Sequence, residues 1–197
     1  MTKAATTEII IREQAISIIA KEGFDGFSMN KLAKASNLSV AAIYIYYKNK
    51  EELLNRLFNH VQTDFSSCML RGFSTDTLFR SGLWILWENY VKFAIANPSH
   101  FMFFNLFRNS HLVNSLDIEI SAFNQAVEQF ARNAINKKEI NGMEPELFWS
   151  LAFGPLDALI KFHLEKENVY THEMFEITKE NLKSLFEMIV TGFQRKK

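Results

Sequence analysis

The sequence predicts an all-α chain of about nine helices, and three observations support this fold class. Apolar residues recur every three or four positions along most of the 197 residues, and no stretch shows the period of two that marks a half-buried strand. Glycine, Asn-Pro and Asn-Gly separate the periodic segments. Between Ser28 and Lys50, two short helical patterns flank a polar turn at Asn37-Leu38-Ser39. This arrangement is typical of a helix-turn-helix unit.

The N-terminal helices are predicted from their caps. A polar arm, Met1 to Thr6, precedes a first helix from about residue 7 to 22, which Gly23 ends. Ser28 caps the second helix, and Phe27 before it can pack on Leu32 as a hydrophobic staple. Ser39 caps the third helix, which begins at Val40. The fourth begins after Asn49, which forms a capping box with Glu52, and runs to about Arg71 before Gly72.

The later helices follow the same signals. An almost wholly apolar helix is expected from about residue 75 to 96 and should be central in the fold. Asn97-Pro98 interrupts the chain, and Ser99 caps a short helix through Phe107. The next helix spans about 116–138, with Leu116 and Ile120 on its apolar face. Pro145 begins another, which Gly154-Pro155 should kink. Thr171 caps the last helix, whose apolar face begins at Phe175 and which ends at Gly192.

Charge singles out the helix-turn-helix segment. Lys31, Lys34, Lys48 and Lys50 are the only charged residues between 28 and 50, so this segment carries +4 in a chain whose net charge is zero. Lys31 lies in the first turn of its helix, where the dipole disfavours a cation unless an anion such as phosphate is close. Any one of these lysines alone can equally be an ordinary solvated side chain. Together they favour binding to DNA phosphates.

Residues 9 to 54 resemble the DNA-binding domain of the TetR family of bacterial transcriptional regulators. The matching features are Lys21-Glu22-Gly23-Phe24, the Ser28 cap, Leu32-Ala33, Leu38-Ser39, Ile43-Tyr44, Tyr46-Tyr47-Lys48-Asn49-Lys50 and Leu53-Leu54. The resemblance implies a DNA-binding domain at residues 1–50 and a helical regulatory and dimerisation domain at 51–197. This sequence departs from the family pattern at two places: Ala41-Ala42 stands where Gly-Thr is common, and Tyr46 replaces the commoner His.

The resemblance also assigns roles within the domain. Ser28, Tyr44, Tyr46 and Lys50 would contact phosphates, and Val40, Ala41, Ala42 and Ile45 would form the exposed edge of the recognition helix. Ile43 and Tyr47 would face inward. With Lys31, Lys48 and Ser39, these phosphate and edge residues make up the expected DNA-binding set. Because the edge lacks Arg, Asn and Gln, we expect an operator with A/T pairs at the contacted positions, read through thymine methyls, Tyr44 and DNA shape.

Composition excludes several other classes of protein. The longest apolar stretch, Leu147 to His163, is interrupted by Ser150, Asp157 and Lys161, so no membrane span or membrane partner is expected. The single cysteine, Cys68, suits a reducing compartment and is read as either a packed side chain or a redox switch. We expect a cytoplasmic protein. No glycine-rich phosphate loop, G-x-S-x-G or H-E-x-x-H pattern is present, so no enzyme is expected.

The remaining body is expected to form a homodimer and to bind an effector. The helix from Pro145 and the last helix have more apolar surface than one core uses, which favours a two-fold four-helix bundle on a pseudo-palindromic operator. The family resemblance adds a cavity for an apolar or aromatic molecule. Its candidate lining comprises Phe65, Met69, Trp87, Asn89, Tyr90, Phe104, Phe107, Phe123, Phe130, Trp149 and Phe153, with Asn124, Gln125, His111 and Asp157 as further polar groups. Asn89 is alternatively a satisfied core amide.

The predicted mechanism is a repressor that its effector releases from DNA. Three alternatives stay open: a regulator whose ligand tightens DNA binding, a DNA-binding dimer with a filled body and no ligand, and a metal or haem sensor that uses His60, His100, His111 or His163. No cofactor and no metal site are predicted, because these histidines lack a recognised ligand spacing.

Overall fold

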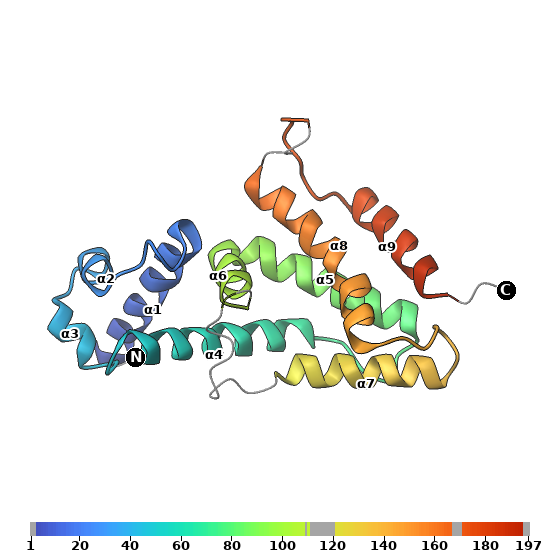
Figure 1. The fold of residues 1–197 in the computed structure, drawn as a ribbon, viewed down its shortest axis with the longest axis horizontal. Coiled ribbons are helices and arrows are strands. Elements are labelled where there is room, and N and C mark those ends of the chain that lie inside the picture. Colours follow the sequence, from blue (N-terminus) through green and yellow to red (C-terminus); the bar gives the residue numbers. More distant parts are fainter. Residues whose placement is uncertain (1–2, 109, 111–120, 167–170, 195–197) are drawn as a thin grey trace. The chain divides into compact units, whose positions relative to one another are not determined.

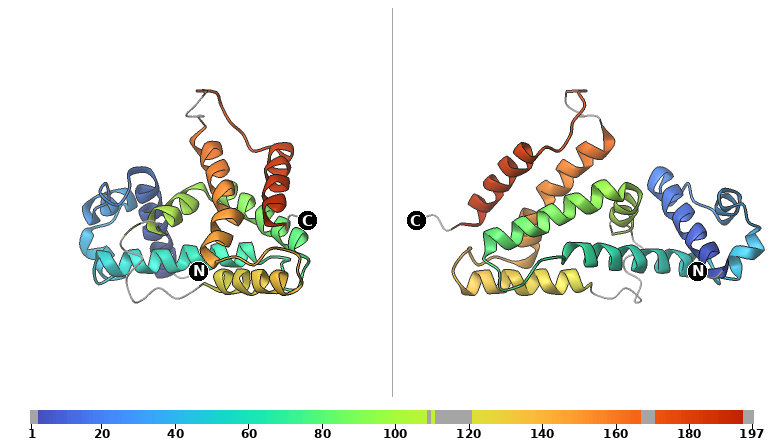
Figure 2. Two further views of the ribbon diagram at one scale, coloured as in Figure 1. Left: turned by 45° about the vertical axis from the view of Figure 1, so that its right-hand side comes forward. Right: turned by 180° about the vertical axis from the view of Figure 1, so that it is seen from behind.

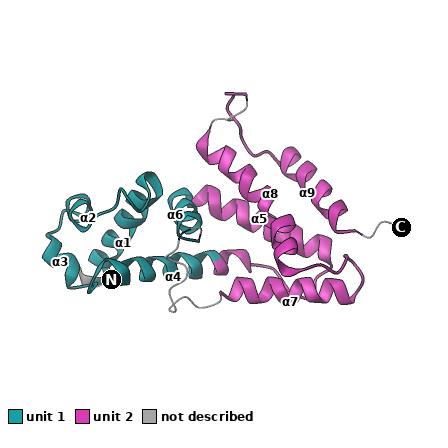
Figure 3. Cartoon of the chain, in the orientation of Figure 1, with its two compact units in different colours: residues 1–65, 97–119 teal, residues 66–96, 120–197 magenta. Residues whose placement is uncertain are grey.

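The chain divides into two compact units in the computed structural model, which describes residues 3–108, 110, 121–166 and 171–194 (Figure 3). Unit 1 comprises residues 1–65 and 97–119, and unit 2 comprises residues 66–96 and 120–197. The described residues form nine helices and no strand, which confirms the all-α fold class. Among these helices, none has the length and apolar character needed to cross a membrane.

Unit 1 joins the N-terminal helices to a helix from the middle of the chain (Figure 1). It contains α1 (Lys3–Glu22), α2 (Met29–Ser36), α3 (Val40–Tyr44), α6 (Pro98–Arg108) and the first part of α4 (Lys50–Met69). Helix α1 packs against both α2 and α6. Its apolar face, which includes Ile11, Ile16 and Ile19, is completely buried. The helix-turn-helix and α6 are therefore attached to the same helix.

Unit 2 is organised around α5 (Phe79–Ala96), which packs against α7 (Ala122–Asn136) and α8 (Pro145–Glu165). Ten of the 18 residues of α5 are buried, which confirms that this helix is central. Helix α8 in turn packs against α9 (Lys179–Phe193), and the two views in Figure 2 show this pair side by side. The α8 helix continues through Gly154-Pro155, and the kink expected there stays a prediction.

Several helix starts differ from those predicted. Helix α1 begins at Lys3, so residues 3–6 belong to a helix and not to a polar arm; Ala4 and Ala5 favour this extension because alanine has the highest helix propensity. Helix α6 begins at Pro98 and not after Ser99, with the Phe101 amide donating to the Asn97 carbonyl at 3.0 Å. Proline is tolerated there because the first helical residue needs no N–H partner.

Helix α5 begins at Phe79, four residues later than predicted, because a distant side chain determines its start. The Phe79 amide donates to Glu139 Oε2 at 2.6 Å, and residues 74–77 form a turn closed by a hydrogen bond from the Thr77 amide to the Ser74 carbonyl at 3.2 Å. The Glu139 carboxylate takes the place of a local N-cap and also favours the positive end of the helix dipole.

The last two corrections concern α7 and α9. Ser121 caps α7 through the Asn124 amide at 3.1 Å, and the predicted earlier turn with Leu116 and Ile120 lies outside the described residues. Thr178, not Thr171, caps α9, so Phe175 precedes that helix. Thr178 and Asn181 form a reciprocal capping box, with amide-to-oxygen distances of 3.2 and 2.9 Å, and two satisfied donors favour this start.

Candidate nucleic-acid interface and effector region

Three capping residues define α2, α3 and the turn between these two helices. Ser28 Oγ accepts from the Lys31 amide at 3.2 Å at the start of α2, and Ser39 Oγ accepts from the Ala42 amide at 3.1 Å at the start of α3. Between them, Asn37 adopts a left-handed conformation with φ of 54°, and the Leu38 amide donates to the Ala33 carbonyl at 2.9 Å. These bonds fix the direction in which α3 leaves α2.

Two buried side chains hold α3 against the rest of unit 1. Ile43 and Tyr47 are 0% and 2% exposed, which confirms that they face inward. The Arg56 guanidinium lies 5.5 Å from the centre of the Tyr47 ring. Burial, followed by the negative charge of Glu8, raises the pKa of the Tyr47 hydroxyl above its ordinary value. Tyr47 is therefore a neutral anchor for the helix.

The opposite edge of α3 faces away from the core. Ala41, Tyr44 and Ile45 are exposed, and the Ile45 side chain is 81% exposed although it is apolar. Val40, Ala42 and Tyr46 are half-buried. Ile45 is the C-cap of α3 and lies between Tyr44 and Tyr46 in the sequence. The expected base-contacting residues thus share one accessible edge, and their contact with DNA stays a prediction.

The four lysines of the segment are all exposed but differ in how they are held. Lys31 Nζ forms an ion pair with Glu22 of α1 and donates to the Gly26 carbonyl at 3.4 Å. Lys50 Nζ donates to the Phe27 carbonyl at 3.3 Å and lies 5.4 Å from the Phe27 ring centre. The sequence shows no acidic residue between 28 and 50, and Glu22 precedes this segment. Its contact with Lys31 was therefore not anticipated. Glu22 thus supplies the anion that a lysine in the first turn of α2 requires, in place of the phosphate suggested from the sequence.

Comparison with known proteins identifies this helix-turn-helix. The family model of the bacterial regulatory proteins of the tetR family matches residues 11–57. The helix-turn-helix of this chain is therefore similar to the DNA-binding domain of the TetR family. A helix-turn-helix-type transcriptional regulator of Haemophilus influenzae is 34% identical over 101 residues, which cover 51% of this chain and 53% of the relative. The chain therefore spans about half the length of that relative.

Solved structures match the fold of the whole chain. A TetR-family transcription regulator from Marinobacter aquaeolei has a TM-score of 0.80 at 24% identity, covering 98% of both chains. The regulator FadR of Bacillus subtilis, solved with stearoyl-CoA, has a TM-score of 0.69 at 20% identity and covers 95% of this chain and 100% of its own. At these identities the likeness establishes the fold alone.

The predicted effector residues are buried, except the half-buried Trp149, but they lie in both units. Phe65, Phe104 and Phe107 belong to unit 1, where Phe65 and Phe104 stack with ring centres 4.9 Å apart. The other eight belong to unit 2. There Phe123, Trp149 and Phe153 contact one another with ring centres 5.2–5.7 Å apart, and Tyr90 lies 5.9 Å from Phe153. We call Tyr90, Phe123, Trp149 and Phe153 the ring cluster.

Polar atoms near the ring cluster have protein partners. Tyr90 Oη donates to Asp157 Oδ1 at 2.5 Å, and Trp87 Nε1 donates to the Ala152 carbonyl at 2.8 Å. Asn89 Nδ2 donates to the Met69 and Arg71 carbonyls at 2.9 and 2.8 Å. Asn89 was expected to be either a ligand contact or a hydrogen-bonded core amide. These hydrogen bonds to carbonyl groups at the C-terminal end of α4 favour the core amide. Among the further polar candidates, His111 lies outside the described residues.

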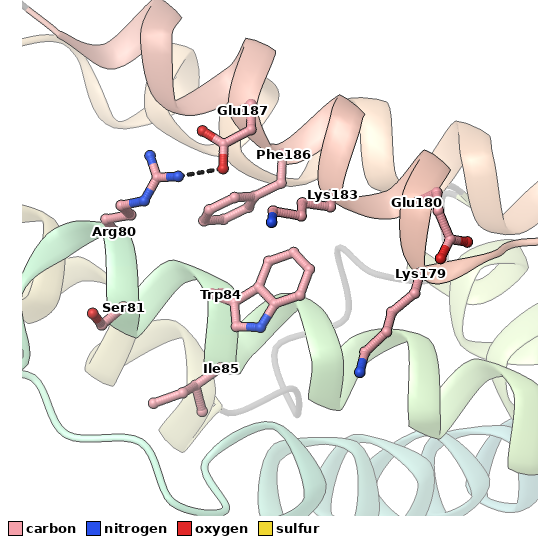
Figure 4. A pocket seen from close by; sticks show the side chains of 9 residues that line it. All are labelled: Arg80, Ser81, Trp84, Ile85, Lys179, Glu180, Lys183, Phe186 and Glu187. Atoms are coloured by element: carbon pink, nitrogen blue, oxygen red, sulfur yellow. Dashed lines mark hydrogen bonds and ion pairs between the residues drawn. The ribbon is translucent and has the colours of Figure 1, made fainter.

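An open groove of about 780 Å³ between α5 and α9 was not anticipated from the sequence (Figure 4). Its lining combines aromatic and charged side chains: Arg80, Ser81, Trp84, Ile85, Lys179, Glu180, Lys183, Phe186 and Glu187. An ion pair between Arg80 and Glu187 joins the two helices, raising the pKa of Arg80 and lowering that of Glu187. Trp84 packs edge-on against Phe186 at 4.9 Å. Spacings of i,i+4 along each helix were the only sequence signal for this groove.

A group of possible metal ligands lies elsewhere, within unit 1. Glu13, His60 and His100 come from α1, α4 and α6, and one ligand atom of each lies within 4.8 Å of those of the other two. Burial, and next the charge of Arg12, lowers the pKa of His60 below its ordinary value. His60 and His100 were considered from the sequence, but Glu13 was not. The three are separated widely along the chain, so no local motif indicates them.

Proposed function

We propose that this protein is a dimeric, sequence-specific DNA-binding transcriptional regulator of the TetR family, and that it is a repressor released from its operator by an apolar or aromatic small molecule. The observation that carries the DNA-binding part is the accessible edge of α3. Ile43 and Tyr47 anchor this helix, so Ala41, Tyr44 and Ile45 project from a rigid support with lysines beside them. A short helix held in this way can enter the major groove while neighbouring hydroxyls and lysines contact phosphates.

The chemistry of this edge defines the expected operator. Methyl and aromatic groups cannot form bidentate bonds with guanine or adenine, whereas they pack well against the thymine methyl. We therefore propose A/T pairs at the positions that α3 contacts. Selection from random duplexes with the full chain, followed by fluorescence anisotropy, tests this. Enrichment of G/C pairs alone at these positions would overturn the proposed readout.

Two variants separate base contacts from phosphate contacts. Ile45→Ala should reduce the preference for A/T at one position, and the lost apolar contact should weaken binding to the selected duplex by about 1–2 kcal/mol. Lys48→Ala should weaken binding to all duplexes similarly and reduce the slope of log K against log salt by about 1. Lys92→Ala, which changes an exposed lysine of α5, is the matched control and should leave both quantities unchanged.

The dimer is proposed through α8 and α9. Exposed or half-exposed positions along one side of α8 are all uncharged, namely Leu147, Ser150, Leu151, Gly154 and Ala158. On α9 the corresponding positions are Ser184, Leu185, Met188, Thr191 and Gly192. Leu147 and Met188 are 60% and 66% exposed, and a hollow of about 470 Å³ lies beside Leu147. Small and apolar residues of this kind suit close helix packing against a second copy.

The effector is proposed to bind at the ring cluster. Large aromatic side chains with a single carboxylate nearby suit an apolar or aromatic compound. FadR of Bacillus subtilis, which shares this fold, was solved with stearoyl-CoA, and this supports a ligand with a long apolar part. To reverse a 99:1 preference for the DNA-binding form, the ligand must favour the released form by about 5.5 kcal/mol.

A panel of apolar compounds, including an acyl-CoA, tests the effector by thermal shift with DNA release measured in parallel. Trp149→Phe alters the ring cluster, and Trp84→Phe alters the α5–α9 groove, which offers lysines for an anionic group. Loss of response only in Trp149→Phe supports the ring cluster; loss only in Trp84→Phe assigns the effector to the groove. A compound that tightens DNA binding would reverse the proposed sign, and a panel without any stabilising compound would favour a regulator with a filled body.

A further inference from the structure

Three helices of unit 1 bring metal-ligand side chains to one place. Glu13 lies on α1, His60 on α4 and His100 on α6. His100 Nε2 is 3.4 Å from Glu13 Oε2, and one ligand atom of each of the three residues lies within 4.8 Å of the others. All three are half-buried, so they are held by packing while solvent and ions can reach them. We propose that Glu13, His60 and His100 bind one divalent transition-metal ion, with zinc as the best match.

The donor set favours zinc over the hard cations. Two imidazoles and one carboxylate are a combination that zinc uses in proteins, with a water molecule as the fourth ligand. Calcium and magnesium prefer oxygen ligands and larger coordination numbers. Zinc–nitrogen and zinc–oxygen bonds of about 2.0–2.1 Å place tetrahedral ligand atoms roughly 3.4 Å apart. The Glu13–His100 distance of 3.4 Å already meets this value, and the third ligand atom, within 4.8 Å of the other two, has to approach by at most about 1.4 Å.

Neighbouring groups support the same assignment. Asp64 Oδ2 lies 3.3 Å from His60 Nε2, one turn further along α4, and a carboxylate beside a ligating imidazole orients the ring and increases its basicity. Arg12 Nε donates to Glu13 Oε1 at 3.2 Å, which leaves Oε2 directed to His100. An ion pair between His100 and Glu13 alone would not require the His60 imidazole within 4.8 Å of both groups. The added histidine from a third helix is what indicates a metal site.

A metal ion here would join α1, α4 and α6 through a single centre. Helix α1 also packs against α2, so the ion would make the support of the helix-turn-helix more rigid. This consequence concerns the stability of unit 1 and does not depend on whether the protein binds DNA. The proposal of a metal site can therefore be tested independently of the proposed DNA-binding function.

Zinc binding to the full-length protein tests the site. After treatment with a chelator, isothermal titration calorimetry and elemental analysis should give one zinc ion per chain. Cobalt(II) in place of zinc should give the visible absorption bands of a tetrahedral site. His60→Gln, His100→Gln and Glu13→Gln should each weaken zinc binding at least about tenfold, and His60→Gln with His100→Gln should abolish the cobalt bands. His172→Gln, an exposed histidine of unit 2, is the matched control and should bind normally.

Circular dichroism of the metal-free proteins ensures that the variants are compared in the folded state. Zinc should also raise the melting temperature of the wild-type chain and of His172→Gln, but not that of the double variant. The proposal is overturned if the wild-type chain binds zinc no more tightly than the folded double variant. It is also overturned if His172→Gln reduces the stoichiometry while the double variant does not.

Discussion

At the scale of single residues, the backbone of Asn37 determines the angle between α2 and α3. Its φ of 54° lies in the left-handed region, which costs most residues about 1–2 kcal/mol. We predict that Asn37→Ala lowers the free energy of unfolding by roughly that amount, whereas Asn37→Gly leaves it nearly unchanged because glycine adopts this conformation freely. Urea unfolding of both variants measures the difference, and equal values would contradict this role for the backbone.

A second residue-scale prediction concerns Gly82 in α5. A Cβ atom at this position would lie 2.6 Å from Phe130 Cε2, and Phe130 is fully buried, in contact with Phe73 and Phe79. Gly82→Ala should therefore destabilise the protein by about 1–3 kcal/mol through overpacking, although alanine is the better helix former. Gly142→Ala is the control, since its Cβ would meet only an Ile135 methyl at 3.9 Å. Thermal unfolding should separate the two variants.

At the scale of elements, a side chain 60 residues away determines the start of α5. The Glu139 carboxylate accepts from the Phe79 amide. Glu139→Ala should cost about 1 kcal/mol, because both a cap and a favourable charge at the helix N-terminus are lost. Glu144→Ala is a matched control at the start of α8, where Glu144 forms no side-chain cap hydrogen bond. Chemical denaturation of the two variants should show a loss for Glu139→Ala alone.

Helix boundaries show how far the sequence predicts these elements. The Ser28 and Ser39 caps were predicted correctly because each bonds to an amide three residues later, so the signal is contained in the local sequence. The start of α5 could not be predicted because its cap comes from the loop after α7. For α9, two threonines offered a cap, and the reciprocal bond with Asn181 decides in favour of Thr178. Local chemistry was sufficient only where the partner was also local.

At the scale of the whole molecule, the same distinction applies to the candidate sites. The inward positions of Ile43 and Tyr47 were predicted from the family resemblance of the local sequence, and their burial confirms them. The contact of Glu22 with Lys31, the meeting of Glu13, His60 and His100 and the groove between α5 and α9 depend on how separate helices pack. In each case the residues come from different helices, at least nine positions apart in sequence, and no spacing within a single helix connects them. Aromatic composition indicated an effector region but could not divide its residues between two units.

The proposed dimer gives the last prediction. Leu147 is 60% exposed at the start of α8, on the uncharged side proposed to meet a second copy. A glutamate there would suit the helix N-terminus of the monomer, but each copy would then bring a buried negative charge into the apolar interface. We therefore expect Leu147→Glu to fold normally and to sediment as a monomer.

The loss of the dimer should appear in DNA binding as a loss of avidity. Two linked DNA-binding units contact half-sites about 34 Å apart, and the second contact strengthens binding by about 10²–10⁴-fold. Leu147→Glu should bind a duplex with two half-sites at least about 10²-fold more weakly than the wild type does. Both proteins should bind a single half-site equally well. Leu78→Glu, at an equally exposed leucine just before α5 (65%), should leave both affinities and the sedimentation unchanged. A dimeric Leu147→Glu protein would place the interface elsewhere.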